Sequence, residues 1–406
     1  MRKIANSFLI LFLLSAIISL AAEGIQLFSN FSIPALFVQF IWSACFICAA
    51  VLYIGIGFNR HLPRLILLPP QLWMLWSLLN YWPLEPAVGH HYNLYASIAQ
   101  LILALIVLQL NRAINGQSLF LTKKQFRGPA FTGVRLLKFV VANIFVFPVL
   151  LFLVLFSLTS NFIEEGSAGF VRLKPNGLYM IERTYRQEDK QIQMMGMIHL
   201  ARSQYYTDLI AAIPQKSTLL LLEGVTDQDK LLKEQFSYGK IAELMGLTSQ
   251  KTSHFQGRLI SKKSLNQLDS NENLEIDLLP ADIDINRFDP LTIKVLNALA
   301  KNVLNTENPL AGYAEFGRWA EQNIPEDFDK TVMNDLLNKR NNHLISYFPA
   351  ALKKYDHLVI PWGALHMKEL EQAVLEQGFK QTESREHLSI DFLLLPFGQW
   401  WDKLTS

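Results

Sequence analysis

The fold of the second half of the chain is decided by the segment from Gln191 to Val225. It begins with Gln191-Ile-Gln-Met-Met-Gly-Met-Ile-His199 and ends with Leu219-Leu-Leu-Leu-Glu223-Gly-Val225. Each of its two apolar runs has the length of a strand and ends in a polar residue, His199 or Glu223. The 24 positions between these residues (223 − 199 = 24) hold enough chain for one helix. We therefore expect a β-α-β unit with its chemistry at the carboxyl ends of the strands.

The same pattern returns near the end of the chain. The segment Asp356-His-Leu-Val-Ile-Pro-Trp-Gly363-Ala-Leu-His366 is an apolar strand followed by Gly-x-x-His, and a helical pattern follows over 368–377. Gly196-Met-Ile-His199 has the same form. Each glycine would allow a sharp bend of the backbone or a close approach to a ligand. Two such junctions predict two histidines at one edge of a sheet.

The remainder of the second half alternates between strand and helix patterns, which predicts an α/β domain over 177–406 with a mostly parallel sheet covered by helices. Residues 161–176 are polar and contain glycine, so a linker is expected there. Strand patterns occupy 177–183, 191–197, 217–222, 278–284 and 389–395, and helical patterns occupy 205–213, 227–247, 289–304, 326–347 and 368–377.

The first 160 residues have a different character. Half of the whole chain is hydrophobic and only 18% is charged, and the apolar excess lies before residue 160. Five stretches have about the 20 residues that a membrane span needs, which predicts an α-helical bundle of about five transmembrane helices over 1–160. The third stretch contains Pro69-Pro70 and is expected to be kinked or re-entrant. The five stretches are Ile4–Ala22, Ile33–Phe58, Leu65–Trp82, Leu94–Leu110 and Phe139–Thr159.

Loop charge predicts the orientation of this bundle. Basic residues occur before the first stretch, between the second and third, and between the fourth and fifth, whereas the loops around Glu23 and Glu85 contain no Lys or Arg. The positive-inside rule then puts the N-terminus in the cytoplasm of an inner or plasma membrane and everything after Thr159 on the extracytoplasmic, periplasmic side. Alternatively, residues 1–22 are a cleaved signal peptide, which leaves the orientation of the later spans unchanged.

Composition argues against several classes of protein. A formal net charge of +2 with no basic stripe predicts no nucleic-acid partner. No acidic residue falls inside a span, which favours a membrane anchor over a transporter. Cys45 and Cys48 have the C-x-x-C spacing of a redox or metal motif, but two small apolar residues on a membrane helix are the favoured interpretation.

Four side chains are candidates for a metal site: His199, Glu223, Asp282 and His366. A divalent metal ion binds neutral imidazoles and carboxylates that converge on one point and leave a position open for water. Such an ion lowers the pKa of bound water to about 7 and polarises a carbonyl group. Glu223 would be either a ligand or the general base. Each residue also has a structural interpretation, because strand-end histidines and carboxylates often only form hydrogen bonds or caps, and Arg340 has the spacing of a solvated helix residue.

Five short motifs resemble, in order and spacing, those of the TraB/PrgY/GumN/Tiki family. The resemblance covers roughly residues 177–395 and not the membrane bundle. It implies an α/β fold related to erythromycin-esterase-like and haem-binding ChaN-like proteins. Tiki members of the family are described as metal-dependent proteases on membrane-tethered ectodomains that use Mn²⁺- or Co²⁺-type ions, and Zn²⁺ would also suit these donors. The motifs are Gly196–His199, Leu222–Val225, Ala281–Asp284, Lys339–Asn341 and Gly363–His366.

Carried over residue by residue, the resemblance implies that His199, Glu223 and His366 are metal or catalytic residues and that Arg340 is a supporting electrostatic group. The chain departs from the family pattern after His366, where a glycine often found nearby is absent, and this puts the substrate in question more than the metal. The sequence thus predicts a membrane-anchored, metal-dependent hydrolase that acts on an extracytoplasmic peptide or protein. Two alternatives are a non-catalytic regulatory protein that binds a peptide signal and a haem- or iron-binding protein.

Overall fold

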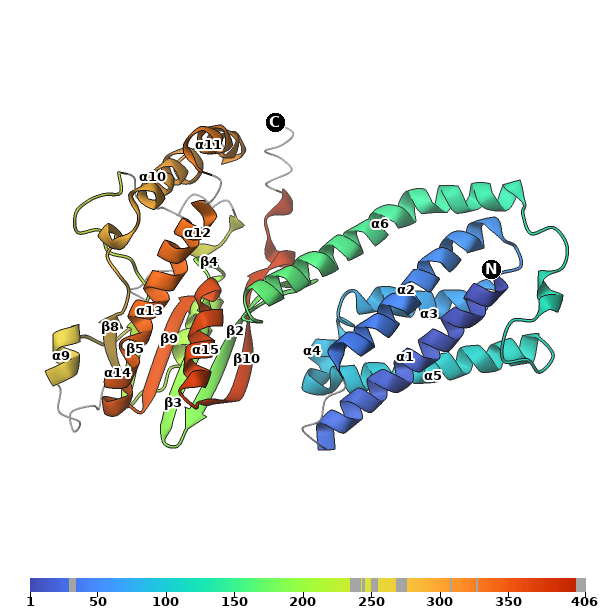
Figure 1. The fold of residues 1–406 in the computed structure, drawn as a ribbon, viewed down its shortest axis with the longest axis horizontal. Coiled ribbons are helices and arrows are strands. Elements are labelled where there is room, and N and C mark those ends of the chain that lie inside the picture. Colours follow the sequence, from blue (N-terminus) through green and yellow to red (C-terminus); the bar gives the residue numbers. More distant parts are fainter. Residues whose placement is uncertain are drawn as a thin grey trace. The chain divides into compact units, whose positions relative to one another are not determined.

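The computed structural model describes the chain except for residues 29–33, 234–241, 243–244, 250–254, 268–275, 307–308, 326–327 and 399–406. Long-range contacts divide the protein into two compact units, Met1–Thr159 and Ser160–Ser406. The first is a bundle of helices and the second is a sheet with helices packed on it (Figure 1).

The first unit is held together by apolar helix packing around side chains such as Phe8, Leu52 and Ile66. In the part of the chain that the structure describes, four helices, α1, α2, α5 and α6, contain a segment long and apolar enough to cross a membrane. The helices are α1 (Arg2–Phe28), α2 (Ala35–Phe58), α3 (Arg64–Ser77), α4 (Leu84–Val88), α5 (Tyr92–Ile114) and α6 (Gly133–Gly166).

The third expected span is shorter than the sequence suggested. Helix α3 has 14 residues, which gives it a length of about 21 Å, whereas the hydrocarbon core of a bilayer is about 30 Å thick. The helix ends at Ser77, and the chain then turns through Asn80 and Tyr81, which both adopt positive φ angles of 49° and 56°. The stretch over 65–82, which the sequence predicted to be kinked or re-entrant, is thus helical only to Ser77, because backbone turns interrupt the apolar run.

The basic segments of this unit lie together at one end. Asn6, near the start of α1, donates a hydrogen bond to the carbonyl of Leu121 in the α5–α6 connection (3.1 Å). The amide of Arg60, which follows α2, donates to the carbonyl of Ala130 (2.9 Å). Arg135, in the first turns of α6, donates to a carbonyl near the end of α2 (2.9 Å). Helix α6 therefore begins at the basic end, and its far end enters the second unit.

The second unit contains one large mixed sheet with a parallel centre. The strands of the centre, in spatial order, are β3 (Lys190–Met197), β9 (His357–Gly363), β5 (Thr218–Leu222), β8 (Ile276–Pro280) and β7 (Arg258–Leu259). On the outer side of β3 the antiparallel strand β2 (Gly177–Gln187) pairs with β3, β1 (Val171–Lys174) and β10 (Lys380–Asp391). The mostly parallel sheet expected from the sequence is thus a parallel centre with an antiparallel extension.

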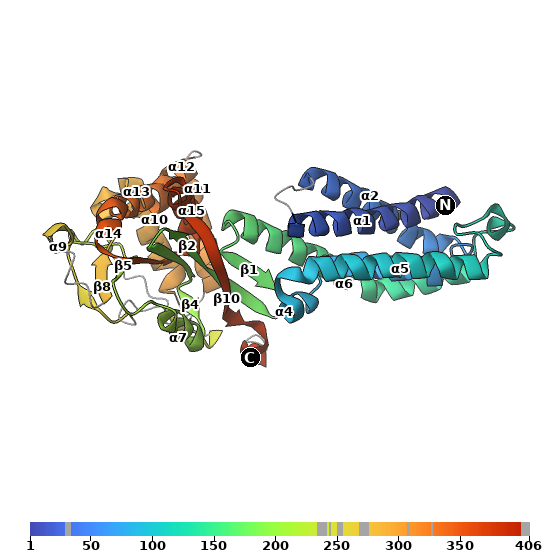
Figure 2. The same cartoon turned by 90° about the horizontal axis from the view of Figure 1, so that it is seen from below.

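Helices cover both faces of this sheet, which explains why its central strands are continuous apolar runs. All five residues of β5 are buried. Helices α13 (Lys339–Ile345), α14 (Phe348–Lys354) and α15 (Met367–Glu376) lie on one face and α7 (Ser203–Ala211) on the other (Figure 2). The remaining elements are β4 (Leu200–Ala201), β6 (Thr248–Ser249), α9 (Lys262–Gln267), α10 (Pro290–Leu299), α11 (Pro309–Asn323) and α12 (Phe328–Met333).

Three local predictions are wrong. The expected linker 161–176 is the last turn of α6 followed by β1. The last strand runs over 380–391 and not 389–395, because it lies at the edge of the sheet and its exposed polar residues hide the strand pattern. Residues 227–233 are not helical, since the carboxylate of Asp227 accepts the amides of Leu231 and Leu232. Most of the remaining residues of that predicted helix, 227–247, lie outside the described part of the chain.

Candidate functional site

The polar strand ends identified in the sequence lie along one edge of the sheet. Met197 of β3 is paired with Gly363 of β9, and the parallel register of β5 with β8 brings their last residues side by side. His199, His366, Glu223 and Asp282 follow these four strands. Because parallel strands all end at the same edge, the sheet brings the residues to one side of the domain, as their positions in the sequence indicated.

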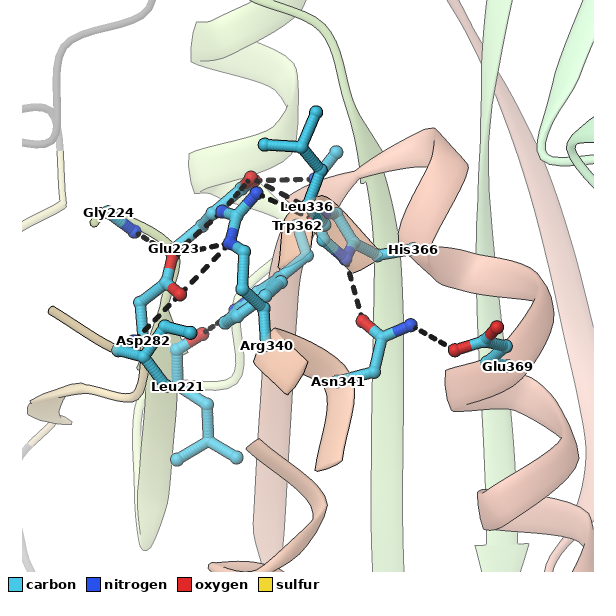
Figure 3. A network of polar contacts seen from close by, with 12 residues as sticks. Leu221, Glu223, Gly224, Asp282, Leu336, Arg340, Asn341, Trp362, His366 and Glu369 are labelled. Carbon is cyan, nitrogen blue, oxygen red and sulfur yellow. Dashed lines mark hydrogen bonds and ion pairs between the residues drawn. The ribbon is translucent and has the colours of Figure 1, made fainter. Parts of the chain in front are cut away.

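Arg340 joins the two carboxylates at this edge (Figure 3). Its side chain comes from α13 and is 11% exposed. One terminal nitrogen, Nη2, lies 2.7 Å from Oε1 of Glu223 and 2.7 Å from Oδ2 of Asp282, and Nε donates to Oδ1 of Asp282 (3.0 Å). The guanidinium also lies over the ring of Trp362, 5.3 Å from its centroid. Burial alone would lower the pKa of Arg340, but the hydrogen bonds and charges of the two carboxylates raise it.

Asp282 uses its acceptor positions within the protein. Besides the guanidinium, Oδ2 accepts the amide of Gly224 (3.0 Å) and Oδ1 accepts the amide of Ile283 (2.8 Å). The side chain is 1% exposed. A carboxylate offers about four lone-pair positions, so these donors leave Asp282 little capacity for another ligand. Its geometry is that of a residue that holds Arg340.

The carboxylate of Glu223 forms hydrogen bonds with both oxygens, and one of these oxygens also lies near His366. Its Oε2 accepts the amide of Gly363 (2.7 Å), and its Oε1, besides accepting from Arg340, lies 3.6 Å from Nε2 of His366. Gly363 has φ −50° and ψ 136°, angles that any residue adopts, so its contribution is this backbone donor. Gly196 differs, because a Cβ atom there would lie 3.2 Å from the carbonyl oxygen of Ile181. The glycines of the two Gly-x-x-His sequences therefore serve different purposes.

A hydrogen-bonded chain orients the ring of His366. The side-chain amide of Asn341 donates to Oε2 of Glu369 (2.7 Å), and Nδ1 of His366 lies 2.6 Å from Oδ1 of Asn341. A carboxylate accepts, so the amide nitrogen of Asn341 must face Glu369 and its oxygen must face the imidazole. Nδ1 of His366 is therefore the donor, and this assignment from the network leaves the lone pair on Nε2. Nε2 lies 3.6 Å from Oε1 of Glu223.

The surroundings of His366 keep its ring neutral. The side chain is buried and packs edge-on against Trp362, with ring centroids 5.0 Å apart. Trp362 is fixed in turn by its indole N–H, which donates to the carbonyl of Leu221 (2.9 Å). Burial and then the positive charge of Arg340 lower the pKa of His366 to about 4. At neutral pH the imidazole is therefore uncharged and carries a lone pair.

His199 is exposed at the end of β3. It lies near enough to contribute electrostatically to the low pKa of His366. The structure thus brings Glu223, Asp282, Arg340 and His366 into one cluster and puts His199 at its rim.

The side chains at this edge are of the types that bind a divalent metal ion, but they do not form a complete set of metal ligands. Within the residues that the structure describes, no three His, Cys, Asp or Glu side chains are gathered to hold a metal ion. Two possible donor atoms, Nε2 of His366 and Oε1 of Glu223, lie 3.6 Å apart. A neutral imidazole whose other nitrogen donates to a second residue is the usual form of a metal-binding histidine.

Three members of the network had no role assigned from the sequence, although Asn341 lies within the motif Lys339–Asn341. Trp362 supports the ring of His366, and Asn341 and Glu369 orient it. Two local signals were present: Asn341 directly follows Arg340, and Glu369 lies three residues after His366 in a helix, at the spacing that places side chains on one face.

Comparisons with models of known protein families, with curated proteins and with solved structures found no match. The fold and the site by themselves define the class: a protein with apolar helices suited to a membrane and a mixed α/β domain. At one edge of its sheet, that domain carries a buried cluster of two carboxylates, an arginine and a neutral histidine.

Proposed function

We propose that this protein is a membrane-anchored hydrolase that cleaves peptide bonds with the help of a divalent metal ion. The membrane part rests on four helices long and apolar enough to span a bilayer. The peptidase and metal parts rest on the resemblance of the motifs to the TraB/PrgY/GumN/Tiki family. The observation that carries the proposal is the 3.6 Å separation between Nε2 of His366 and Oε1 of Glu223.

These two atoms have lone pairs and share no hydrogen. A neutral imidazole protonated on Nδ1 and an ionised carboxylate are both acceptors, so a cation or the proton of a water molecule between them would stabilise the pair. The pKa of about 4 makes His366 a weak base at neutral pH, since a general base works best when its pKa lies near the working pH. A metal ligand, in contrast, must be neutral imidazole. The low pKa favours the ligand role for His366.

His366 and Glu223 would hold the metal ion, and His199 from the neighbouring strand end would supply a third donor. The bound ion would lower the pKa of a water ligand and polarise the carbonyl of the substrate. Asn341 and Glu369 fix the imidazole so that Nε2 faces the ion. Asp282, a candidate ligand from the sequence, instead positions Arg340, whose single positive charge lies between the two carboxylates and offsets part of their charge.

The α/β domain would work on the extracytoplasmic side. The N-terminus and the connections after α2 and α5, which carry the basic residues of the bundle, lie at the end where α6 begins. The positive-inside rule assigns that end to the cytoplasm, and α6 then leads the chain across the bilayer. A reporter enzyme that is active only in the periplasm, fused after Thr159 (an inactive fusion would reverse the orientation), tests this assignment.

Metal content and activity of the purified full chain test the proposed chemistry. We expect about one divalent ion per chain and cleavage of a peptide library, both lost in His366→Ala. Glu223→Gln separates its two roles, because a ligand variant loses the ion whereas a general-base variant keeps the ion and loses turnover. His357→Gln is the matched control, since His357 lies at the opposite end of the same strand as Gly363.

The outcomes distinguish the other functions. Peptide binding that is insensitive to a chelator and produces no cleavage would replace the hydrolase by a protein that binds a peptide signal. A Soret band would identify a haem protein. Metal content unchanged in His366→Ala would refute the proposed metal site.

A further inference from the structure

The chain after β10 exposes large apolar side chains on the α/β domain. Leu393 is 82% exposed and Leu394 is 74% exposed. They lie in a short 3-10 turn whose first amides are capped by Asp391, because its carboxylate accepts the amide of Leu393 (3.0 Å). Two neighbouring leucines held outward by an ordered turn are costly in water, and such patches generally mark a contact with an apolar partner.

This turn lies close to the last turns of α6. Phe392 donates its amide to the carbonyl of Asn176 in the β1–β2 turn (3.0 Å). Near the same end of β1, the hydroxyl of Ser160 on α6 donates to the carbonyl of Leu173 (3.0 Å). Leu173 is paired with Leu178 of β2, and Leu178 is paired with Ile390 of β10. Two strand spacings of about 4.8 Å therefore separate the strand bonded to α6 from the end of β10, where the exposed leucines begin.

The end of α6 marks the surface of the membrane that it would span. The apolar stretch predicted from the sequence ends at Thr159, and the exposed Phe162 and then Glu164 and Glu165 follow it. Charged side chains are costly in the hydrocarbon core, so the two glutamates belong in the head-group region or in water. Ser160 and the strand bonded to it therefore lie at the level of the head groups.

We propose that Leu393 and Leu394 insert into the head-group region of the same bilayer and hold the α/β domain against its surface. Short apolar segments beside a membrane anchor bind at this boundary by burying a few side chains. The partner is the lipid surface, because the segment adjoins a helix that itself enters the lipid. The inference concerns how the domain lies on the membrane and does not depend on the proposed hydrolase activity.

The geometry of the sheet gives this contact a consequence for the candidate site. Strand β2 is antiparallel to β3, so its start, which is paired with Asp391, lies at the edge where β3 ends. That is the edge with His366 and Glu223. From β10 to β5 the order is β10, β2, β3, β9 and β5, and four spacings of about 4.8 Å separate them by about 19 Å. The edge that carries the site is thus the edge at the bilayer.

Fluorescence quenching in lipid bilayers tests the contact on the full chain. The two cysteines of the protein, Cys45 and Cys48, are replaced by alanine, and one new cysteine at Leu394 carries an environment-sensitive fluorophore. The matched control is the same label at Leu259, a leucine 70% exposed in β7 at the far side of the sheet. Phosphatidylcholine vesicles contain a lipid with a spin label near its head group, and iodide is the quencher in water.

We expect the label at Leu394 to be quenched by the lipid several-fold more than the label at Leu259, and by iodide several-fold less. Leu393→Cys should behave in the same way, which guards against a local defect of one variant. Equal quenching at the two positions would overturn the proposal. Protection of the Leu394 label from both quenchers would also overturn it, because a protein surface would then cover the segment.

Discussion

Replacing Arg340 by methionine should destabilise the α/β domain strongly. Methionine keeps much of the volume of the side chain but removes the charge between Glu223 and Asp282. Both carboxylates are largely buried, and Asp282 is 1% exposed. Each then loses its only charged partner among the described residues of the cluster.

The structure sets the size of the effect. Removing one partner of a buried ion pair costs about 3–5 kcal/mol, because an uncompensated charge remains. Asp282 keeps the amides of Gly224 and Ile283 as donors, which favours the lower part of this range. Loss of the cation–π contact with Trp362, which is long at 5.3 Å, adds about 1 kcal/mol. We therefore expect a loss of about 4 kcal/mol in the free energy of unfolding.

Pulse proteolysis of the full chain in nanodiscs measures this loss. A short exposure to protease at increasing urea concentration cleaves only unfolded α/β domain, and the surviving fraction gives the midpoint of unfolding. With a urea m-value of about 2 kcal/mol per M, the midpoint should fall by about 2 M. The control is Arg385→Met, which removes an exposed ion pair with Glu383 and should cost less than about 1 kcal/mol.

A double variant checks the cause. In Arg340→Met/Asp282→Asn the buried charge is removed together with its partner, so about 2 kcal/mol of the loss should be recovered as coupling between the two sites. The reasoning would be refuted if Arg340→Met cost no more than Arg385→Met. It would also be refuted if the double variant were as unstable as the sum of the two single variants.

Three further outcomes are expected. Between pH 6.5 and 4, His366 is protonated in the unfolded state but remains neutral in the folded state, because its folded pKa is about 4. The free energy of unfolding of the wild type should therefore fall by up to about 3 kcal/mol more than that of His366→Gln as the pH falls from 7 to 4 in the same assay. Parallel pH curves for the two proteins would contradict this. Gly196→Ala should lower the free energy of unfolding by about 1–3 kcal/mol, because its Cβ would press on a backbone carbonyl. Gly363→Ala meets nothing closer than 3.5 Å and should lower it clearly less. Equal losses would show that the contact at Gly196 is unimportant. Asn341→Leu should weaken Mn²⁺ binding about 10–100-fold by calorimetry, and an unchanged affinity would mean that the hydrogen-bonded chain does not orient His366.

The sequence determined the features that local hydropathy patterns predict. Long apolar runs marked the helices that are long and apolar enough to cross a membrane, and short apolar runs marked β3, β5, β8 and β9. Because these strands are parallel, the residue after each one had to lie at a common edge. The pairing of β9 with β5, which brings His366 beside Glu223, is seen only in the structure. The family resemblance and the metal-dependent activity remain predictions.

Local patterns misled where solvent or backbone geometry overrides them. β10 is an edge strand with exposed polar residues, so it lacks the apolar alternation of a strand with a buried face. Helix α3 ends within an apolar run because the backbone turns at Asn80 and Tyr81. A hydropathy pattern does not predict turns of this kind.

Only the tertiary structure decided what the site residues do. On its own helix Arg340 has the spacing of a solvated side chain, and it becomes the buried link between Glu223 and Asp282 only because α13 packs across the strand ends. In the same way, the contacts of Asn341 with His366 and Glu369 join two helices and fix which imidazole nitrogen carries the lone pair. Periodicity reports which face of an element is apolar, whereas hydrogen bonds and pKa shifts depend on distances of a few ångströms between elements remote in sequence, and those distances exist only in the packed fold.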